Sequence, residues 1–202
     1  MSEEKEEYFH CKIILVGDSG VGKTSIIGRY LKNYNENEKS TIGASYSSKS
    51  EKINGYSINF DIWDTAGQER YKSVNQIFYK EAFICIMVYD ITKKETFQSI
   101  ENYWHQAVKD NSSNEIIFGV AGNKIDLYEE ETVDQKEVQE YCDRIGATFR
   151  TTSAKANTYI DDFFLELGQK FINSDLFKHI EPEIKYKKLN KNKNKKRKIK
   201  FC

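Results

Sequence analysis

Hydrophobic positions along the chain follow two different periods, and these predict alternating strands and helices. Continuous apolar runs, which are typical of strands buried on both faces of a sheet, occur at 13–16, 83–89 and 116–120. Over 97–108, apolar residues instead recur every three or four positions, as in a helix that packs on one side. Thr92 and Thr132 each start a predicted capping box, so we expect helices to begin just after them. The pattern predicts an α/β fold, with a mostly parallel sheet and helices on both faces.

A hairpin supplies the one antiparallel edge strand of this expected sheet. The dipeptide 54–55, Asn-Gly, is a two-residue turn signal between segments 46–53 and 56–63, and the second segment alternates apolar with polar residues. A short strand at 148–152 and a helix at 160–171 follow. The sequence thus predicts six strands, and in such sheets ligands bind at the carboxyl ends of the parallel strands.

Length and composition indicate one globular domain with a tail. The chain has 202 residues, 39% of them hydrophobic, and we expect a flexible acidic N-terminus at 1–9, a globular domain at 10–178 and a disordered basic tail at 179–202. The acidic start is no signal peptide, and the longest apolar run, 82–89, is far too short to cross a bilayer. We therefore expect a protein that is kept in the cytosol.

The net charge of zero hides an asymmetry between tail and body. Ten of the 31 basic residues lie in 185–200, which contains no acid, so the rest of the chain is acidic. An acidic body argues against binding to nucleic acid, whereas the tail suits an anionic membrane surface.

Cys11, Cys85 and Cys142 lie in apolar or amphipathic segments, so we expect buried reduced thiols.

A phosphate-binding loop follows the first strand. Residues 17–24 read Gly-Asp-Ser-Gly-Val-Gly-Lys-Thr, a pattern in which backbone N–H groups wrap the β- and γ-phosphates of a nucleotide. In this pattern Lys23 adds a positive charge and the Thr24 hydroxyl ligates Mg²⁺. The predicted phosphate-binding residues of this loop are Ser19, Gly20, Val21, Gly22, Lys23, Thr24 and Ser25. An ordinary glycine-rich turn is the alternative, and the strand before the loop and the helix pattern after it weigh against that.

Three further motifs each follow a predicted strand. After the hairpin, Asp64 could reach Mg²⁺ through water, the Gly67 N–H could meet the γ-phosphate, and Gln68 could orient a water molecule. After the predicted strand at 116–120, the Asp126 carboxylate could accept hydrogen bonds from guanine N1–H and its amine, a donor pair that adenine lacks. The third motif, Ser153-Ala154-Lys155, follows the predicted strand at 148–152. The predicted base-contacting residues besides Asp126 are Asn123, Lys124, Ser153, Ala154 and Lys155. Each motif alone could be an ordinary loop, but their order and their places at strand ends favour a guanine-nucleotide site.

With these motifs the chain resembles the Ras superfamily of small GTPases and, within it, the Rab family. The resemblance covers about residues 12–172 and is strongest at 40–43, 62–71 and 87–92. It implies a small G domain with a GTP-hydrolysing switch, in which Gln68 and Lys23 are the catalytic residues. It also implies that Thr41 ligates Mg²⁺ and senses the γ-phosphate. Segments 42–46 and 68–71 look most like the endosomal branch of Rab proteins.

The same resemblance implies surfaces for partners. Tyr34 would cover the guanine, and Tyr46, Trp63 and Phe78 would form an aromatic triad that meets effectors, although core packing is an alternative for aromatic residues on strands. The other expected partners are an exchange factor, a GTPase-activating protein and, if the chain is prenylated, a dissociation inhibitor. We expect a monomer in the cytoplasm and on the cytoplasmic face of intracellular membranes, endosomes among them.

The chain departs from the Rab pattern at three places. Segment 33–41 is one residue shorter than usual, and Lys80-Glu81-Ala82 stands where Arg-Gly-Ala is usual. The tail ends in Cys202 alone rather than in two cysteines, with nothing after it to form a C-a-a-X box. Prenylation of Cys202 together with the basic tail would satisfy the two-signal requirement for stable anchoring, and a solvated tail with a free thiol is the alternative.

The sequence leaves three alternative functions. One is a nucleotide-locked GTP-binding scaffold without an efficient hydrolytic cycle, and another is a non-Rab Ras-like signalling GTPase. The third is a P-loop kinase or ATPase, which would need an arginine-bearing lid and an acceptor site, and neither is evident.

Overall fold

The fold of the computed structural model is described here for residues 3–35, 41, 43–65, 77–113 and 115–188. One mixed sheet runs through it in the order β2-β3-β1-β4-β5-β6, with β7 paired to β1. Only the β2–β3 and β1–β7 pairs are antiparallel. The strands are β1 (Glu3–Val16), β2 (Ala44–Ile53), β3 (Tyr56–Thr65), β4 (Ile84–Asp90), β5 (Ile117–Asn123), β6 (Thr148–Thr151) and β7 (Glu183–Lys188).

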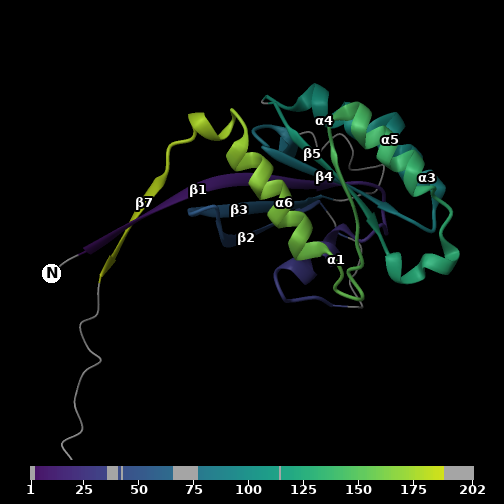
Figure 1. The fold of residues 1–202 in the computed structure, drawn as a ribbon, viewed down its shortest axis with the longest axis horizontal. Coiled ribbons are helices and arrows are strands. Elements are labelled where there is room, and N and C mark those ends of the chain that lie inside the picture. Colours follow the sequence, from purple (N-terminus) through teal and green to yellow (C-terminus); the bar gives the residue numbers. More distant parts are fainter. Residues whose placement is uncertain (1–2, 36–40, 42, 66–76, 114, 189–202) are drawn as a thin grey trace, which may run out of the picture.

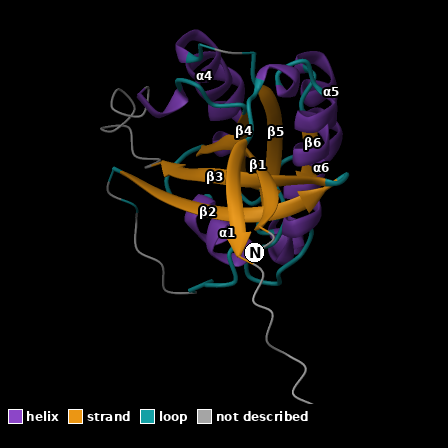
Figure 2. Cartoon of the chain, turned by 90° about the vertical axis from the view of Figure 1, so that its left-hand side faces the viewer, coloured by secondary structure: helices purple, strands orange, loops and turns teal. Residues whose placement is uncertain are grey.

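Helices cover both faces of this sheet (Figures 1 and 2). Residues of α1 and α6 pack with one cluster of buried side chains, and residues of α3, α4 and α5 pack with a second cluster on the opposite face. The helices are α1 (Lys23–Tyr30), α3 (Lys94–Ser99), α4 (His105–Asn111), α5 (Gln135–Ile145) and α6 (Ile160–Asn173). Short 3-10 helices lie at Ile125–Glu130 and Phe177–His179. The predicted α/β architecture is therefore confirmed.

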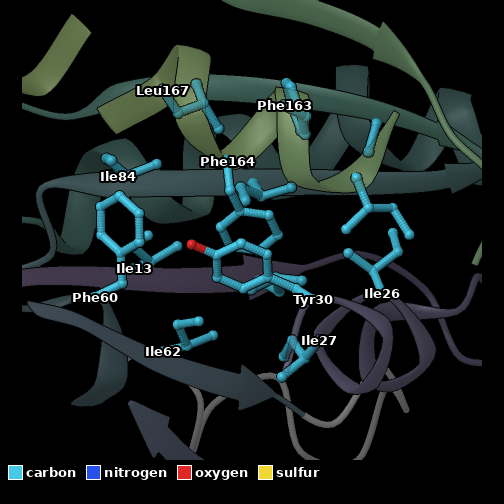
Figure 3. Close-up of a cluster of buried hydrophobic side chains, with 14 of the residues drawn as sticks. Ile13, Ile26, Ile27, Tyr30, Phe60, Ile62, Ile84, Phe163, Phe164 and Leu167 are labelled. Atoms are coloured by element: carbon cyan, nitrogen blue, oxygen red, sulfur yellow. The ribbon is translucent and has the colours of Figure 1, made fainter. Parts of the chain in front are cut away.

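The first cluster fixes helix α1, which begins at the phosphate loop. Tyr30 of α1 stacks on Phe164 of α6 with ring centroids 3.9 Å apart and planes 5° apart (Figure 3). Both rings also pack near Phe60 of β3, and all three side chains are buried. Because large aromatic side chains contribute much of the free energy of core packing, this stack holds α1 in place against the sheet.

The six predicted strands are present, and a seventh strand was not predicted. Strand β1 begins at Glu3, so most of the N-terminus expected to be flexible at 1–9 is strand, and β7 lies inside the segment 179–202 expected as a tail. The register pairs Glu3 with Lys188, Glu4 with Lys187 and Glu6 with Lys185. At the Glu6–Lys185 pair this register sets opposite charges across the two strands, which is favourable, although neither segment has the hydrophobic pattern of a strand (Figure 1).

Both predicted capping boxes are wrong in detail. Helix α3 begins at Lys94 and has no side-chain cap, because the Thr92 hydroxyl donates instead to Asp90 at 2.8 Å. Helix α5 is capped by Asp134, which accepts a hydrogen bond from the Lys136 N–H at 2.9 Å, rather than by Thr132. A π-helical turn, Ile100–Trp104, also joins α3 to α4 where the sequence predicts one regular helix.

Cys11, Cys85 and Cys142 are free and buried, as predicted. Among the described residues, none of the helices combines the length and the apolar character that a membrane span requires.

Candidate functional site

The predicted phosphate loop lies between the carboxyl end of β1 and the first turn of α1. Gly17 has a φ of 140°, and a Cβ there would lie 2.2 Å from the Val88 carbonyl oxygen of β4. Gly22 has a φ of 99°, and a Cβ there would lie 2.3 Å from the side-chain nitrogen of Asn123. The two glycines therefore let the loop pack directly onto its neighbours in a backbone conformation that other residues rarely adopt. Within the loop, Ser19 and Gly20 are exposed and Val21 is buried.

Lys23 is held inside this loop. Its ammonium group donates hydrogen bonds to the carbonyl oxygens of Gly17 at 2.7 Å and Asp18 at 2.8 Å, and the residue is only 6% exposed. Burial lowers the pKa of Lys23 to about 8, and the nearby carboxylates of Asp64 and Asp18 partly oppose that shift. The buried ammonium group, bonded here to two carbonyl oxygens, would gain from an anion placed in the same loop.

Three oxygen atoms from three separate segments meet beside Lys23. The Thr24 hydroxyl donates to Asp64 Oδ2 at 2.5 Å and lies 2.8 Å from the Thr41 hydroxyl, which donates to the same Asp64 oxygen at 3.1 Å. The end of β3 is positioned by Thr65, whose hydroxyl donates to the Leu15 carbonyl of β1 at 2.6 Å. Two hydroxyls and a carboxylate form the hard oxygen set that Mg²⁺ prefers. The structure thus brings the three predicted metal ligands together.

Asn123 joins the phosphate loop to the last loop of the predicted site. Its side-chain nitrogen donates to the Val21 carbonyl at 2.9 Å. Its side-chain oxygen accepts from the Ala154 N–H at 3.2 Å and from the Thr152 hydroxyl at 3.3 Å. Asn123 is buried, and from the carboxyl end of β5 its bonds reach two segments, the phosphate loop and the residues after β6. It therefore holds the phosphate end and the base end of the site in one arrangement.

The remaining base-site residues lie around Asp126. The Ser153 hydroxyl donates to Asp126 Oδ1 at 2.5 Å and accepts from the Ala156 N–H at 2.8 Å. Lys124, in the left-handed conformation with a φ of 71°, donates to Asp90 Oδ2 at 2.6 Å. Lys155 is exposed beside them. The structure therefore gathers the predicted residues of 123–126 and 153–155 into one loop cluster.

Sequence reasoning missed the role of Asp90, which ends β4. Burial opposes its charge, but hydrogen bonds from Lys124 and Thr92 outweigh this and lower the pKa of Asp90 below its ordinary value. An acid that ends one buried strand, followed by a lysine at the end of the next strand, was the signal that could have found this pair.

Two more residues of the site, Arg29 and Trp104, make contacts there but belong to no sequence motif. The Arg29 guanidinium of α1 lies 3.7 Å from the centroid of the Tyr34 ring and donates to the carbonyls of Ala154 and Lys155. The Trp104 indole N–H, at the end of the π-helical turn, donates to Asp18 of the phosphate loop at 2.9 Å.

The predicted aromatic triad is contiguous. The rings of Tyr46 and Trp63 are 5.4 Å apart, and those of Trp63 and Phe78 are 5.2 Å apart. Tyr46 is 54% exposed and Phe78 is partly exposed, while Trp63 is partly buried and packs against the second core cluster. Gly67, Gln68 and Cys202, which the sequence assigns to γ-phosphate binding, catalysis and lipidation, lie outside the described residues.

Comparisons with known proteins agree with this geometry. The model of the Ras family matches residues 12–173. Ras-related protein Rab-21 of Canis lupus familiaris is 40% identical over 164 residues, which are 81% of this chain and 73% of that protein. Ras-related protein Rab-22A of Homo sapiens is 38% identical over 81% of this chain and 84% of that protein. Ras-related protein RabJ of Dictyostelium discoideum is 38% identical over 88% of this chain and 70% of that protein. The chain belongs to the Ras family and is a Rab small GTPase of the endosomal branch, a GTP hydrolase that regulates vesicle trafficking.

Proposed function

We propose that the carboxyl edge of this sheet binds a guanine nucleotide with Mg²⁺, and that GTP hydrolysis there switches the protein between an effector-binding form and a released form. One observation carries the proposal. A buried lysine, a three-oxygen cluster and the Asp126 loop lie at carboxyl ends of strands of one sheet, and the side chain of Asn123 joins the phosphate loop to the loop after β6.

The phosphate half of the proposed site uses the loop from Ser19 to Ser25. Its backbone N–H groups and the start of α1 favour an anion, and Lys23 would move from its two carbonyl contacts to the phosphates. Ras-family GTPases generally use Mg²⁺ with the nucleotide. Thr24 and Thr41 would hold the ion directly and Asp64 through water, and the ion would supply positive charge at the phosphates.

The base half of the proposed site uses the loops after β5 and β6. Asp126 would accept hydrogen bonds from guanine N1–H and its amine, while Ser153 holds the carboxylate in position. The Lys124 and Lys155 stems and the Tyr34 ring would pack against the base. A carboxylate left without those donors is costly, so Asp126 would select guanine over adenine.

Catalysis in this proposal rests on charge and placement. Lys23 stabilises negative charge on the phosphates, and Gln68 orients the attacking water. Arg29, which contacts the base loop, is already bonded to two carbonyl oxygens and faces Tyr34. We therefore propose that a GTPase-activating protein supplies the further positive charge that fast hydrolysis needs.

The aromatic triad and the basic tail suggest which partners and which membrane the protein contacts. Regulators and effectors in general follow from the Rab family, and we propose that effectors contact Tyr46, Trp63 and Phe78 in the GTP form. We further propose that the basic tail and a prenylated Cys202 attach the protein to the cytoplasmic face of endosomal membranes. A dissociation inhibitor would then extract the lipid-bearing GDP form.

Competition binding with a fluorescent GDP analogue tests the nucleotide site. We expect unlabelled GDP and GTP to displace the probe at concentrations at least about a thousandfold lower than ADP, because only guanine offers Asp126 two donors. Chelation of Mg²⁺ by EDTA should speed release of the probe at least about tenfold, because the oxygen cluster would lose its shared cation. Equal competition by ADP, or release that EDTA does not change, would contradict the proposed site.

A further inference from the structure

Arg29 makes three contacts from one side chain on the second turn of α1. Its Nε donates to the Ala154 carbonyl at 2.7 Å and its Nη2 donates to the Lys155 carbonyl at 2.9 Å. The guanidinium carbon lies 3.7 Å from the centroid of the Tyr34 ring. One side chain therefore joins α1 both to the loop after β6 and to the aromatic residue that follows α1.

The backbone brings Tyr34 to Arg29 by reversing after α1. Lys32 adopts a left-handed φ of 62°, and the Asn33 N–H donates to the Gly28 carbonyl at 2.8 Å. A Cβ on Gly28 would lie 3.4 Å from the Tyr34 Cα, an ordinary van der Waals distance, so the chain after the helix folds back directly against Gly28. Tyr34 is thus placed beside Arg29 by the end of the helix.

Arginine is suited to these contacts in a way that lysine is not. The planar guanidinium presents several N–H donors in a fixed fork, so it can donate to two neighbouring carbonyls while its face covers an aromatic ring. Hydrogen bonds from an ionised donor are also stronger than neutral ones. The two carbonyls belong to the loop that contains Ser153 and Ala154, and Ser153 in turn contacts Asp126.

We propose that Arg29 is a positioning residue that fixes two walls of the base site, the Tyr34 ring and the 153–155 loop, before the nucleotide arrives. The inference rests on the proposed function, since it assumes that guanine lies between these walls. Walls that are already ordered reduce the conformational entropy lost on binding, and the gain in affinity appears mainly as slower release. Arg29 would thereby make α1 serve both ends of the nucleotide, because the same helix carries Lys23 and Thr24.

Release kinetics of two nucleotides with the same phosphates test this role. In Arg29→Gln we expect GDP release about tenfold faster than in the wild type, with a smaller loss of affinity for ADP, because the Tyr34 ring can stack on either base whereas the 153–155 loop and Asp126 engage guanine alone. Arg29→Lys keeps a cation near Tyr34 but cannot bridge both carbonyls, so its GDP release should be intermediate. The ratio of ADP to GDP dissociation constants should therefore fall.

A matched control is available on the far side of the molecule. Arg144 of α5 also lies over a tyrosine ring, Tyr141, with 5.3 Å to the centroid, and Arg144→Gln should leave GDP release unchanged. Unchanged GDP release in Arg29→Gln would overturn the inference, and so would an equal loss of GDP and ADP affinity, which would indicate general damage to the site. If Arg29→Gln does not fold by circular dichroism, Arg29→Lys decides in the same way. A wild type that does not prefer GDP to ADP would instead overturn the proposed nucleotide site.

Discussion

Asp126 is the residue on which base selection depends. It is partly buried, it lies on the 3-10 helix after β5, and Ser153 donates to one of its carboxylate oxygens. A carboxylate held in this way accepts hydrogen bonds from a ligand but cannot donate them.

Asp126→Asn should therefore move base preference from guanine toward xanthine. The amide would present a donor where guanine also has donors, and xanthine offers a carbonyl there instead. We expect affinity for GDP to fall at least about a hundredfold and affinity for xanthosine diphosphate to rise, since two charge-assisted hydrogen bonds are lost. Competition binding measures both, with Asp162→Asn on the exposed face of α6 as the control. Retained GDP affinity in Asp126→Asn would refute the assignment.

Glu81 is part of one departure from the Rab pattern, and its backbone conformation shows why glycine is usual at this position. It stands where the family usually has glycine, and it adopts a left-handed φ of 61°, with its N–H donating to the Ser113 hydroxyl at 3.2 Å. The left-handed conformation costs residues with a Cβ about 1–2 kcal/mol. The chain accepts this strain at the turn before β4.

Glu81→Gly should stabilise the protein. Relief of the strain outweighs the greater entropy that glycine gives the unfolded chain, so we expect the free energy of unfolding to rise by about 0.5–1 kcal/mol. Urea denaturation measures this change. Glu81→Ala keeps the Cβ and should show no such gain, and a loss of stability in Glu81→Gly would mean that the glutamate side chain contributes more than its backbone costs.

At the scale of elements, the unpredicted strand β7 is attached to the sheet through His10. Its Nδ1 lies 2.7 Å from Asp61 of β3, and its Nε2 lies 3.0 Å from Glu183 of β7. Asp61 also accepts from the Tyr46 hydroxyl at 2.7 Å, and Lys185 lies 3.2 Å from Glu183. Hydrogen bonds to Glu183 and Asp61 raise the pKa of His10, because they favour the imidazolium, which donates from both ring nitrogens.

The attachment of β7 should therefore weaken as pH rises. A raised folded-state pKa gives a stabilisation that is complete below the ordinary histidine pKa of about 6.5 and is lost as pH rises through the raised value. The His10 side chain is 47% exposed, so we expect less than about 1 kcal/mol. Amide hydrogen exchange of β7, corrected for intrinsic rates, should show lower protection at pH 9 than at pH 6. In His10→Gln this difference should vanish, and a difference that persists would place the titrating group elsewhere.

The sequence predicted helices and strands wherever their burial produces a regular spacing of apolar residues. Strands β4 and β5 are apolar runs because both faces are covered, and α5 and α6 show the helical period because one face is buried. Strand β7 shows no such period, since its backbone pairs with β1 and its residue Ile184 is 45% exposed rather than buried. The π-helical turn at 100–104 adds one residue to a turn without changing which residues are buried, so it too is invisible in the pattern.

The residues of the site likewise fall into those that the sequence predicts and those that it does not. Residues expected to touch a ligand lie in motifs with fixed spacing, such as Lys23 and Thr24 or Asn123 and Asp126, and the structure gathers them. Arg29 and Trp104 contact other parts of the protein instead, at the Ala154 carbonyl and at Asp18. Their partners are more than eighty residues away in the chain, and only the folded topology brings them together.

At the scale of the whole molecule, strand β1 separates the nucleotide site from the tail. Its carboxyl end leads into the phosphate loop, while its amino-terminal residues pair with β7, where the basic segment starts (Figure 1). Fourteen extended residues span about 45 Å, so the paired ends of β1 and β7 lie far from the phosphate loop. The triad of Tyr46, Trp63 and Phe78 lies on the hairpin side of the sheet. We therefore expect the proposed switch to reach partners through the segments at Thr41 and after Asp64.

Single-turnover hydrolysis of GTP by the purified chain with Mg²⁺, compared with Gln68→Leu, tests the switch most directly. By comparison with Ras, a related protein, we predict a wild-type rate on the order of 10⁻⁴ to 10⁻³ s⁻¹. We expect Gln68→Leu to be at least about tenfold slower while it binds GTP as tightly, because only the orientation of water is lost. Equal rates would contradict the role of Gln68. A wild type that binds GTP without hydrolysing it would show a nucleotide-locked scaffold and contradict the account of a switch.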